Sequence, residues 1–237
     1  MLLRVLLLVL LIIQPLHASR NFTEAKRVGG KIFLTHPKTL YCQCKYNRKL
    51  QIDLSSCHME AAASKKRALR VEWEHMMPAE HFGKQFQCWQ EKICSSKGTP
   101  YKGRRCCEKV DRAFQQAEGE LYNLWPAEGL INQARSNYRY AELESKSDYF
   151  GCSFKVDKEL RKAEPDDEVK GIVARANLFM ADRYHILLSA SQRKLFMAWN
   201  NRFPPDYWEM EWAAKVAEME GYSNPYIIQA MANKEKV

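Results

Sequence analysis

After its first residues, the sequence contains no long hydrophobic run. Nothing in residues 19–237 approaches the length of a membrane span, so we expect this part of the chain to be soluble. The chain also has no internal repeat, no low-complexity tract and no long linker rich in proline, glycine or serine. These absences argue against a repeat array or a string of modules, and they predict a single domain over residues 19–237.

The first 18 residues have the three-part layout of a secretory signal peptide. Arg4 provides a positive start, residues 5–13 form an unbroken apolar run, and small residues follow near Ala18. The apolar run is too short to cross a bilayer. A buried N-terminal helix and a retained anchor are the alternatives. We expect cleavage after Ala18, no membrane attachment afterwards, and a periplasmic or secreted mature protein.

The charge of the chain is basic. Lysine and arginine number 37 against 28 acidic residues, a formal charge of +9, which becomes +8 once Arg4 is removed. An apolar content of 46% with 11% aromatic residues indicates a true core and argues against disorder. A basic exported protein favours a polyanionic partner, and the charge alone leaves nucleic acid, an anionic membrane surface and an acidic glycan open.

The cysteines are even in number, which in an exported chain predicts four disulfides. The eight are Cys42, Cys44, Cys57, Cys88, Cys94, Cys106, Cys107 and Cys152. A zinc site is the alternative, but the pairs 42/44 and 106/107 lack the spacing that zinc ligands usually have. Geometry disfavours a bridge within either pair, so each member should reach a different partner. The sequence leaves the pairing open.

Two strands and one helix are predicted in the cysteine-containing half. Polar and apolar residues alternate over Leu50–Leu54 and Ala68–His75, as they do in half-buried strands. Pro78 should end the second strand, which places its last side chains near a turn. Three-four spacing of apolar residues predicts a helix over 110–124, stopped by Pro126.

The C-terminal part is predicted to be helical. Start signals stand at Pro165–Glu168, at the capping box Ser189-x-x-Gln192 and at Pro204–Asp206, and Gly221 should end the third helix. Aromatic residues at helical spacing in this part are expected to form core rather than a site. We interpret these helices as a scaffold.

The residues best suited to chemistry are Glu74, His75 and Asn123. A carboxylate beside an imidazole offers a hard oxygen ligand and a general base that titrates near neutral pH. A surface salt bridge is the plainer interpretation of that pair. Asn123 offers an amide oxygen, also a ligand for Mg²⁺ or Ca²⁺, although helix-end amides more often serve as caps. His81 lacks the spacing of a zinc-binding helix and is expected in a loop.

Several motifs, taken in order, resemble the bacterial endonuclease I family over nearly the whole mature chain. They are Tyr41-Cys42-x-Cys44, Glu72-Trp73-Glu74-His75 with Pro78-Ala79 and Phe82-Gly83, Cys88-Trp89, Lys102-Gly103-Arg104-Arg105-Cys106, Tyr122-Asn123-Leu124, Arg135-Ser136-Asn137-Tyr138, Ala198-Trp199-Asn200, Asp206-x-Trp208-Glu209 and Asn224-Pro225-Tyr226. No single motif is specific, but the shared order of all of them is.

The resemblance implies an α+β fold with a ββα-metal (His-Me finger) core, in which short antiparallel strands lie on a mainly helical, disulfide-linked domain. A ribbon ends at the histidine and a helix supplies the asparagine. It implies a metal-dependent endonuclease that hydrolyses DNA and RNA without sequence preference and leaves 5′-phosphate ends. Transferred by motif, His75 is the general base, and Glu74 and Asn123 bind Mg²⁺, with Ca²⁺ or Mn²⁺ as alternatives. We expect a monomer.

Contacts to phosphates carry no sequence information, which suits a nonspecific enzyme. Five basic residues are candidates for such contacts, each with a solvated surface charge as the alternative: Lys102, Arg104, Arg105, Arg135 and Arg139. Glu108 is either an acid supporting the metal site or a helix-start carboxylate.

The chain departs from its relatives near the C-terminus, where Met210 and Met231 stand at places that hold cysteines in many of them. We therefore expect no disulfide on the last helix. The rival functions are an exported, basic, disulfide-rich nucleic-acid-binding protein without catalysis, and a different hydrolase on a helical scaffold. The first rival does not explain Glu74, His75 and Asn123 together, and activity on nucleic acid versus other phosphodiesters would distinguish the second.

Overall fold

The computed structural model describes residues 21–144 and 149–234. The expected signal peptide, residues 1–18, lies outside the described residues. Within them, helices and short strands are mixed in one disulfide-linked body, so the predicted α+β class is confirmed at that level. No described helix has the length and apolar character needed to cross a bilayer.

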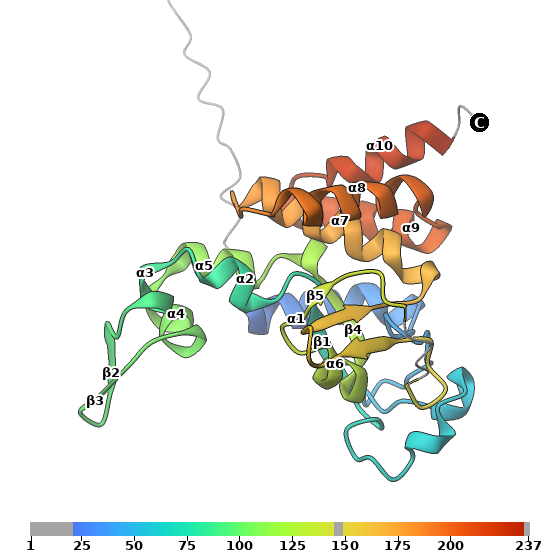
Figure 1. Ribbon diagram of the computed structural model, residues 1–237, viewed down its shortest axis with the longest axis horizontal. Coiled ribbons are helices and arrows are strands. Elements are labelled where there is room, and N and C mark those ends of the chain that lie inside the picture. The colour runs from blue at the N-terminus through green and yellow to red at the C-terminus, as the bar shows by residue number, and fades with distance from the viewer. Residues whose placement is uncertain (1–20, 145–148, 235–237) are drawn as a thin grey trace, which may run out of the picture.

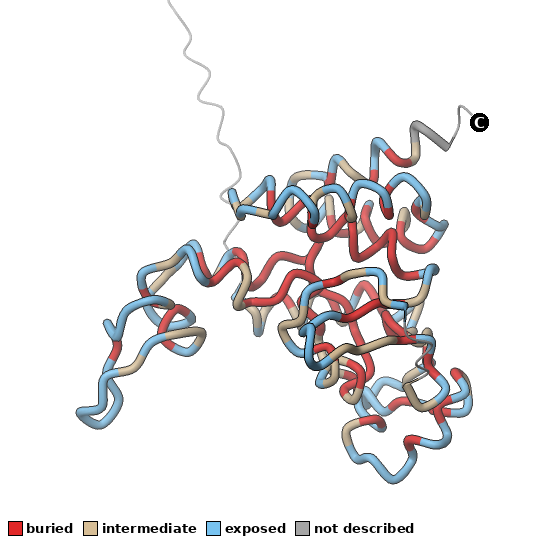
Figure 2. Tube along the Cα trace, viewed as in Figure 1, coloured by how far each residue is buried: buried red, intermediate tan, exposed pale blue. Residues whose placement is uncertain are grey.

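The C-terminal helices form one side of the molecule, and the strands lie against them (Figure 1). These helices are α7 Asp167–Arg183, α8 Ala190–Arg202, α9 Tyr207–Glu220 and α10 Pro225–Lys234. α7 is buried over most of its length, and the red of the buried residues in Figure 2 is concentrated along it and the central strands. The core therefore lies between the helical layer and the strands.

The predicted start signals of these helices are confirmed. The Asp166 side chain caps α7 by accepting from the Glu168 amide, Ser189 caps α8 through Gln192, and Asp206 caps α9. Each cap satisfies a backbone donor that has no partner within its helix. Gly221 ends α9 with φ of 76°, a conformation that costs glycine little.

Two antiparallel strands run through the centre of the structure. They are β1 Val71–His75 and β4 Leu124–Glu128, in a register that pairs Val71 with Glu128 and His75 with Leu124. Helix α6 Gly129–Arg135 follows β4 directly and packs against both strands. The strand predicted over 68–75 is therefore confirmed from Val71 onward, and His75 ends it.

The helix predicted over 110–124 is wrong beyond residue 118. The segment contains α5 Arg112–Glu118, a 3-10 turn at Leu121–Asn123, and then β4. The Asp111 and Glu120 side chains start new capped turns, and Gly119 separates them. Pro126 lies within β4: its carbonyl accepts from the Leu40 amide at 2.8 Å, so its missing N–H faces away from β1 and costs the pairing nothing.

The strand predicted at Leu50–Leu54 is also wrong. Isolated bridges join Tyr46 to Ile52 and Gln51 to Arg70, and Leu54 opens a 3-10 turn that ends at Cys57. Leu50 has φ of 59°, outside the strand region. Of the alternating apolar residues in this loop, Ile52 and Leu54 pack on the core, whereas Leu50 is exposed.

The remaining elements are short. A hairpin pairs β2 Cys94–Ser96 with β3 Thr99–Tyr101, and a small sheet has the order β5–β7–β6, formed by Arg139–Tyr140, Lys162–Glu164 and Lys155–Asp157. The further helices and 3-10 turns are α1 Phe22–Ile32, η1 Phe33–Thr35, η3 Glu60–Ala62, α2 Ala79–Gly83, α3 Gln87–Gln90 and α4 Arg104–Val110. His81, expected in a loop, lies instead in α2.

All eight cysteines form disulfides, as predicted, and no member of a close pair bonds to its neighbour. The bonds are Cys42–Cys152, Cys44–Cys57, Cys88–Cys107 and Cys94–Cys106. The last two staple the lobe of α3, β2, β3 and α4, which projects from the body and is mostly exposed (Figures 1 and 2). Such a small lobe buries too little apolar surface to hold itself together, so covalent bonds take over part of that task. Helix α10 carries no disulfide, which confirms the expectation for the last helix.

Candidate active site

Glu74 and His75 end β1, and because strand side chains alternate they leave it in opposite directions. Glu74 is only 2% exposed. Its Oε1 accepts a hydrogen bond from the Tyr41 hydroxyl at 2.7 Å and pairs with Arg135 Nη1 at 2.9 Å. Burial raises the pKa of Glu74, and Arg135 and Tyr41 partly offset that rise. The surroundings therefore orient this carboxylate before any ligand arrives.

Arg135, the last residue of α6, holds the end of β1 in place. Its Nη1 donates to the carbonyl of His75 at 2.9 Å and its Nη2 to that of Met76 at 2.5 Å. The side chain is 1% exposed, and Nη1 and Nη2 both meet protein groups, whereas Nε has no hydrogen-bond partner among the described residues. Arg135 was predicted as a phosphate contact, and its geometry instead suits a residue that positions Glu74 and the backbone of His75.

The imidazole of His75 has a defined tautomer. Its Nε2 lies 2.8 Å from the carbonyl oxygen of Glu118, which can only accept, so in the neutral ring Nε2 carries the hydrogen and Nδ1 keeps a lone pair. The rings of Phe22 and Phe82 lie against it, with centroids 4.7 and 6.0 Å away. Burial, followed by the charge of Arg104, lowers the pKa of His75 to about 3. The ring is therefore neutral at ordinary pH.

Asn123 is completely buried in the 3-10 turn that leads into β4. Its Oδ1 accepts from the Met77 amide at 2.6 Å, and its Nδ2 donates to the Met77 carbonyl at 3.0 Å. Its own carbonyl accepts from the Met76 amide at 3.0 Å. The turn thus brings Asn123 to the chain that directly follows His75. A 3-10 turn supplies this residue, where the resemblance implied a helix.

The donor set of Glu74 and Asn123 suits a hard divalent cation. Both hydrogen-bonding contacts of Glu74 with other described residues use Oε1, and Oε2 takes part in neither of them. The amide oxygen of Asn123 accepts the Met77 hydrogen bond with one lone pair, and its second lone pair can bind a cation. One carboxylate and one amide oxygen are ligands that Mg²⁺, Ca²⁺ and Mn²⁺ accept.

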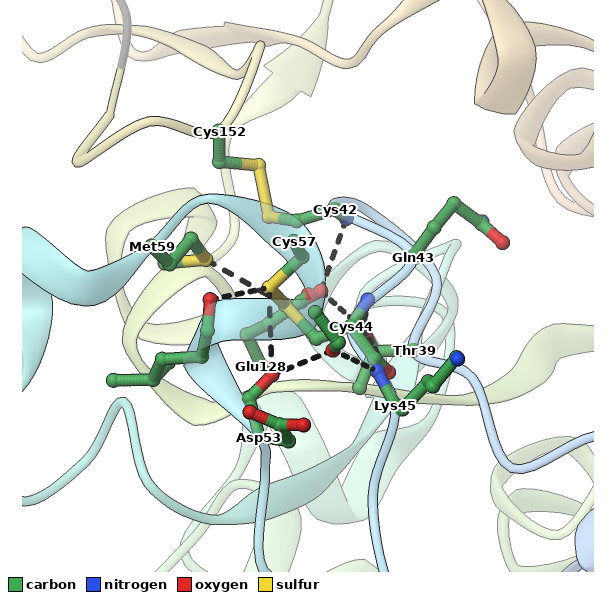
Figure 3. Close-up of a disulfide and its surroundings, with 12 residues drawn as sticks. Thr39, Cys42, Gln43, Cys44, Lys45, Asp53, Cys57, Met59, Glu128 and Cys152 are labelled. Carbon is green, nitrogen blue, oxygen red and sulfur yellow. Dashed lines mark hydrogen bonds between the residues drawn. A yellow bond between two sulfur atoms is a disulfide. The ribbon is translucent and has the colours of Figure 1, made fainter.

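A different cluster, formed by Cys42, Cys44 and Glu128, also brings potential ligand atoms close together, and Figure 3 shows its surroundings. Both cysteines are in disulfides, so neither offers the thiolate that a metal would need. The Glu128 carboxylate accepts from the Thr39 hydroxyl and the Cys42 amide. Burial raises its pKa. This cluster therefore supports the disulfide loop and is not a metal centre.

The other predicted phosphate contacts fall in two places. Lys102, Arg104 and Arg105 lie together at the start of α4, beside a cavity of about 430 Å³. Arg104 Nε pairs with Glu118 at 2.6 Å and Glu108 at 3.2 Å. Arg139 is exposed on β5 and lines another cavity.

Glu118 and Tyr41 are the residues that sequence reasoning missed. Glu118 holds the His75 ring through its carbonyl and Arg104 through its carboxylate, whose pKa burial raises to about 7. A main-chain carbonyl leaves no signature in a sequence. Tyr41 stood within a recognised motif, but nothing there pointed to its bond with Glu74. Glu108, predicted either as a supporting acid or as a helix-start residue, is a partly exposed partner of Arg104.

These observations define a disulfide-linked α+β protein with an acid–imidazole pair fixed at a strand end beside a buried amide. The chain belongs to the endonuclease I family, whose model matches residues 33–231. It is 41% identical over 218 residues to an extracellular deoxyribonuclease of Aeromonas hydrophila, covering 90% of this chain and 91% of that protein. A periplasmic deoxyribonuclease of the same organism is 39% identical over 227 residues, covering 93% of this chain and 91% of that protein.

Endonuclease-1 of Buchnera aphidicola subsp. Baizongia pistaciae (strain Bp) is 36% identical over 217 residues, covering 89% of this chain and 84% of that protein. Membership of the family makes this chain a nonspecific nuclease and therefore a hydrolase. The periplasmic or extracellular location predicted from the sequence is confirmed by the names of the relatives.

Proposed function

We propose that the protein is a divalent-metal-dependent endonuclease that hydrolyses DNA and RNA and leaves 5′-phosphate and 3′-hydroxyl ends. The observation that carries the proposal is the bond between His75 Nε2 and the Glu118 carbonyl, because it leaves Nδ1 as an unprotonated base in a buried ring. The strand pair β1–β4 with α6 is then the ββα unit of the site.

His75 acts as the general base in this scheme. Nδ1 takes a proton from a water aligned behind the scissile phosphorus, while the Glu118 carbonyl holds the ring. A neutral imidazole at this position needs no prior deprotonation. The bond between phosphorus and the 3′ oxygen then breaks, and the phosphate stays on the 5′ oxygen of the next nucleotide. The departing 3′ oxygen takes up a proton from solvent and becomes the 3′ hydroxyl.

Glu74 and Asn123 are the residues that would hold the cation, Mg²⁺ in the first instance. When bound, the cation supplies charge stabilisation on the phosphate and leaving oxygens. Tyr41 and Arg135 hold Glu74 in orientation, and the two bonds to Met77 do the same for Asn123. Lys102, Arg104, Arg105 and Arg139 are proposed to contact phosphates. We propose that the protein acts as a monomer.

Incubation of the purified protein with supercoiled plasmid tests the proposal. We expect nicking and then smearing with Mg²⁺, and neither with excess chelator. Radiolabelled RNA and end-group analysis of the products test the substrate range and the 5′-phosphate. A protein that binds plasmid but leaves it intact at every metal concentration would instead be the non-catalytic binding module.

A further inference from the structure

A cavity of about 620 Å³ lies beside α2, away from the His75 ring. Phe82 of α2 packs against that ring, whereas Glu80, His81 and Lys84 line the cavity. The other walls come from residues 137–140, 160–161 and 185–188, and from Met77, Pro78, Gln85, Arg135, Asn177, Gln192 and Phe196. Its volume is in the range of small-molecule pockets.

Basic side chains dominate the charge of this cavity. Four line it: Lys84, Arg135, Arg139 and Arg161. Among its described lining residues the one carboxylate is Glu80, which pairs with Lys84 at 2.6 Å. A second cavity of the same volume carries both signs, with Asp167, Glu168, Asp206 and Glu209 beside Lys38, Arg175 and Arg202. The two cavities therefore match in size and differ in charge, and the first one favours an anion.

Arg139 and Arg161 carry the excess positive charge. Within the described parts of the chain, no carboxylate lies at ion-pair distance from either guanidinium, whereas Arg135 pairs with Glu74. Arg161 Nη2 donates to Asn137 Oδ1 at 2.8 Å, and its guanidinium lies 5.4 Å from the centre of the Tyr138 ring. Both arginines keep donors for an incoming oxyanion, and guanidinium groups match phosphate geometry well.

Flat and apolar surfaces line the same cavity. Tyr138 is half-buried there, and Leu187 is 97% exposed at its edge. Burial, followed by the charges of Arg135 and Arg139, lowers the pKa of His81 to about 4. The His81 ring therefore adds planar surface without charge near neutral pH. A ligand in which an anionic group is joined to a planar, weakly polar ring would contact both the arginines and these planar and apolar surfaces.

We infer that this cavity holds one nucleotide of the substrate strand, with phosphate against Arg139 and Arg161 and the base against Tyr138 and Leu187. The inference rests on the proposed function, and it extends the substrate contacts beyond the scissile phosphate. A base must leave its stack to enter, which costs more free energy in a duplex than in a single strand. The site therefore favours unpaired nucleotides.

Fluorescence anisotropy of a labelled single-stranded oligonucleotide in excess chelator tests this site without cleavage. The double variant Arg139→Gln/Arg161→Gln should bind more weakly, and the slope of log K against log salt should fall by about 0.7, the contribution of the one phosphate that loses its cations. The matched control is Arg48→Gln/Arg202→Gln, which removes two exposed arginines outside the cavity. Equal slopes in the two double variants would overturn the site.

Competition separates a nucleotide site from a plain anion site. A 5′-mononucleotide should displace the oligonucleotide better in the parent than in a Tyr138→Ala variant, which keeps both arginines, and inorganic polyphosphate should not show this difference. Equal behaviour of the two competitors would overturn the assignment of a nucleotide. An oligonucleotide carrying 4-thiothymidine should photo-crosslink to the peptide containing Tyr138 or to that containing Leu187, and crosslinks confined to other peptides would contradict the location. Because chelator prevents cleavage in these assays, they can detect nucleotide binding even if the protein is not a nuclease. Conversely, a nuclease that lacks this site would cleave plasmid with Mg²⁺ and fail the binding assays.

Discussion

At His75, burial and the positive charges of Arg104, Arg135 and Lys26 act in the same direction on the imidazole. Each disfavours the protonated ring, whereas the Glu118 carbonyl favours it and is outweighed. The printed sequence shows a histidine beside a glutamate, which would ordinarily raise the pKa of the histidine. In the fold the Glu74 carboxylate pairs with Arg135, and the imidazole meets cations and aromatic rings instead. The residue is thus a neutral base because of its neighbours.

Replacement of this base tests its role at the residue scale. We expect His75→Asn to lose a factor of about 10²–10⁴ in plasmid cleavage, the range for general-base catalysis, and to keep its affinity for DNA in chelator. His58→Asn is the control, because His58 is an exposed histidine outside the site. Nicking gels and anisotropy give the two readouts. Cleavage by the His75 variant at the parental rate would remove this residue from the mechanism.

Asn123 has two tasks in the structure, which makes its replacement informative. Asn123→Ala should raise the Mg²⁺ concentration needed for half-maximal cleavage, because an oxygen ligand is lost. It should also lower the free energy of unfolding by about 1–3 kcal/mol, because the buried amide and carbonyl of Met77 lose their partners. A metal titration and a urea titration measure these effects separately. An unchanged metal titration in a destabilised variant would leave Asn123 a structural residue alone.

At the scale of elements, buried ion pairs join segments that are distant in the sequence. Arg135 ties α6 to the end of β1, and Arg175 ties α7 to α9 through Glu209, with Nε–Oε1 and Nη2–Oε2 distances of 2.6 and 2.5 Å. Arg175 also donates to the Phe203 carbonyl at 2.8 Å, just beyond the end of α8. One guanidinium therefore fixes the relation of three helices.

Breaking this second pair should be costly. Arg175→Met leaves a buried carboxylate at Glu209 without its charge partner, and we expect a loss of about 3–5 kcal/mol in the free energy of unfolding. The double variant Arg175→Met/Glu209→Met should recover most of that loss, since no unpaired charge remains. Urea denaturation of the parent, these two variants and the single variant Glu209→Met completes a double-mutant cycle. If the double variant were as unstable as the single one, the loss would come from packing and not from the charge.

At the scale of the whole molecule, a buried acidic group should link stability to pH. Glu120 is 1% exposed and accepts from the hydroxyls of Tyr184 and Tyr222 at 2.8 and 2.7 Å. Burial, followed by the charge of Glu220, raises the pKa of Glu120 from 4.5 to about 7. Between these values the folded state holds a proton that the unfolded state releases, so this group's stabilising contribution is complete below pH 4.5 and is lost as pH rises towards 7.

Glu120→Gln removes that dependence. The stability of the variant relative to the parent should rise between about pH 4.5 and 7, by on the order of 3 kcal/mol for a shift of this size. Glu60→Gln, at an exposed position, serves as the control and should show no such trend. Thermal denaturation at a series of pH values gives the comparison. A difference that stays constant with pH would mean that folding does not raise the pKa of Glu120.

Much of this molecule could be predicted from local patterns. The caps of α7, α8 and α9, the strand that ends at His75 and the use of every cysteine in a disulfide depend on neighbouring residues or on export, so the sequence alone determined them. The order of the motifs determined the family. Local patterns failed at 50–54 and 119–124, where tertiary contacts outweighed apolar periodicity.

Only the tertiary structure decided the cysteine pairing, the burial of Arg135, the approach of the Glu118 carbonyl to His75, and the basic cavity beside α2. Each of these features brings together residues that are far apart along the chain. A local sequence pattern shows the chemistry of each side chain, but it does not show which side chains are buried together away from water. Charge, hydrogen bonding and pKa depend on that shared environment, because an unscreened interaction in the core is far stronger than the same interaction in water.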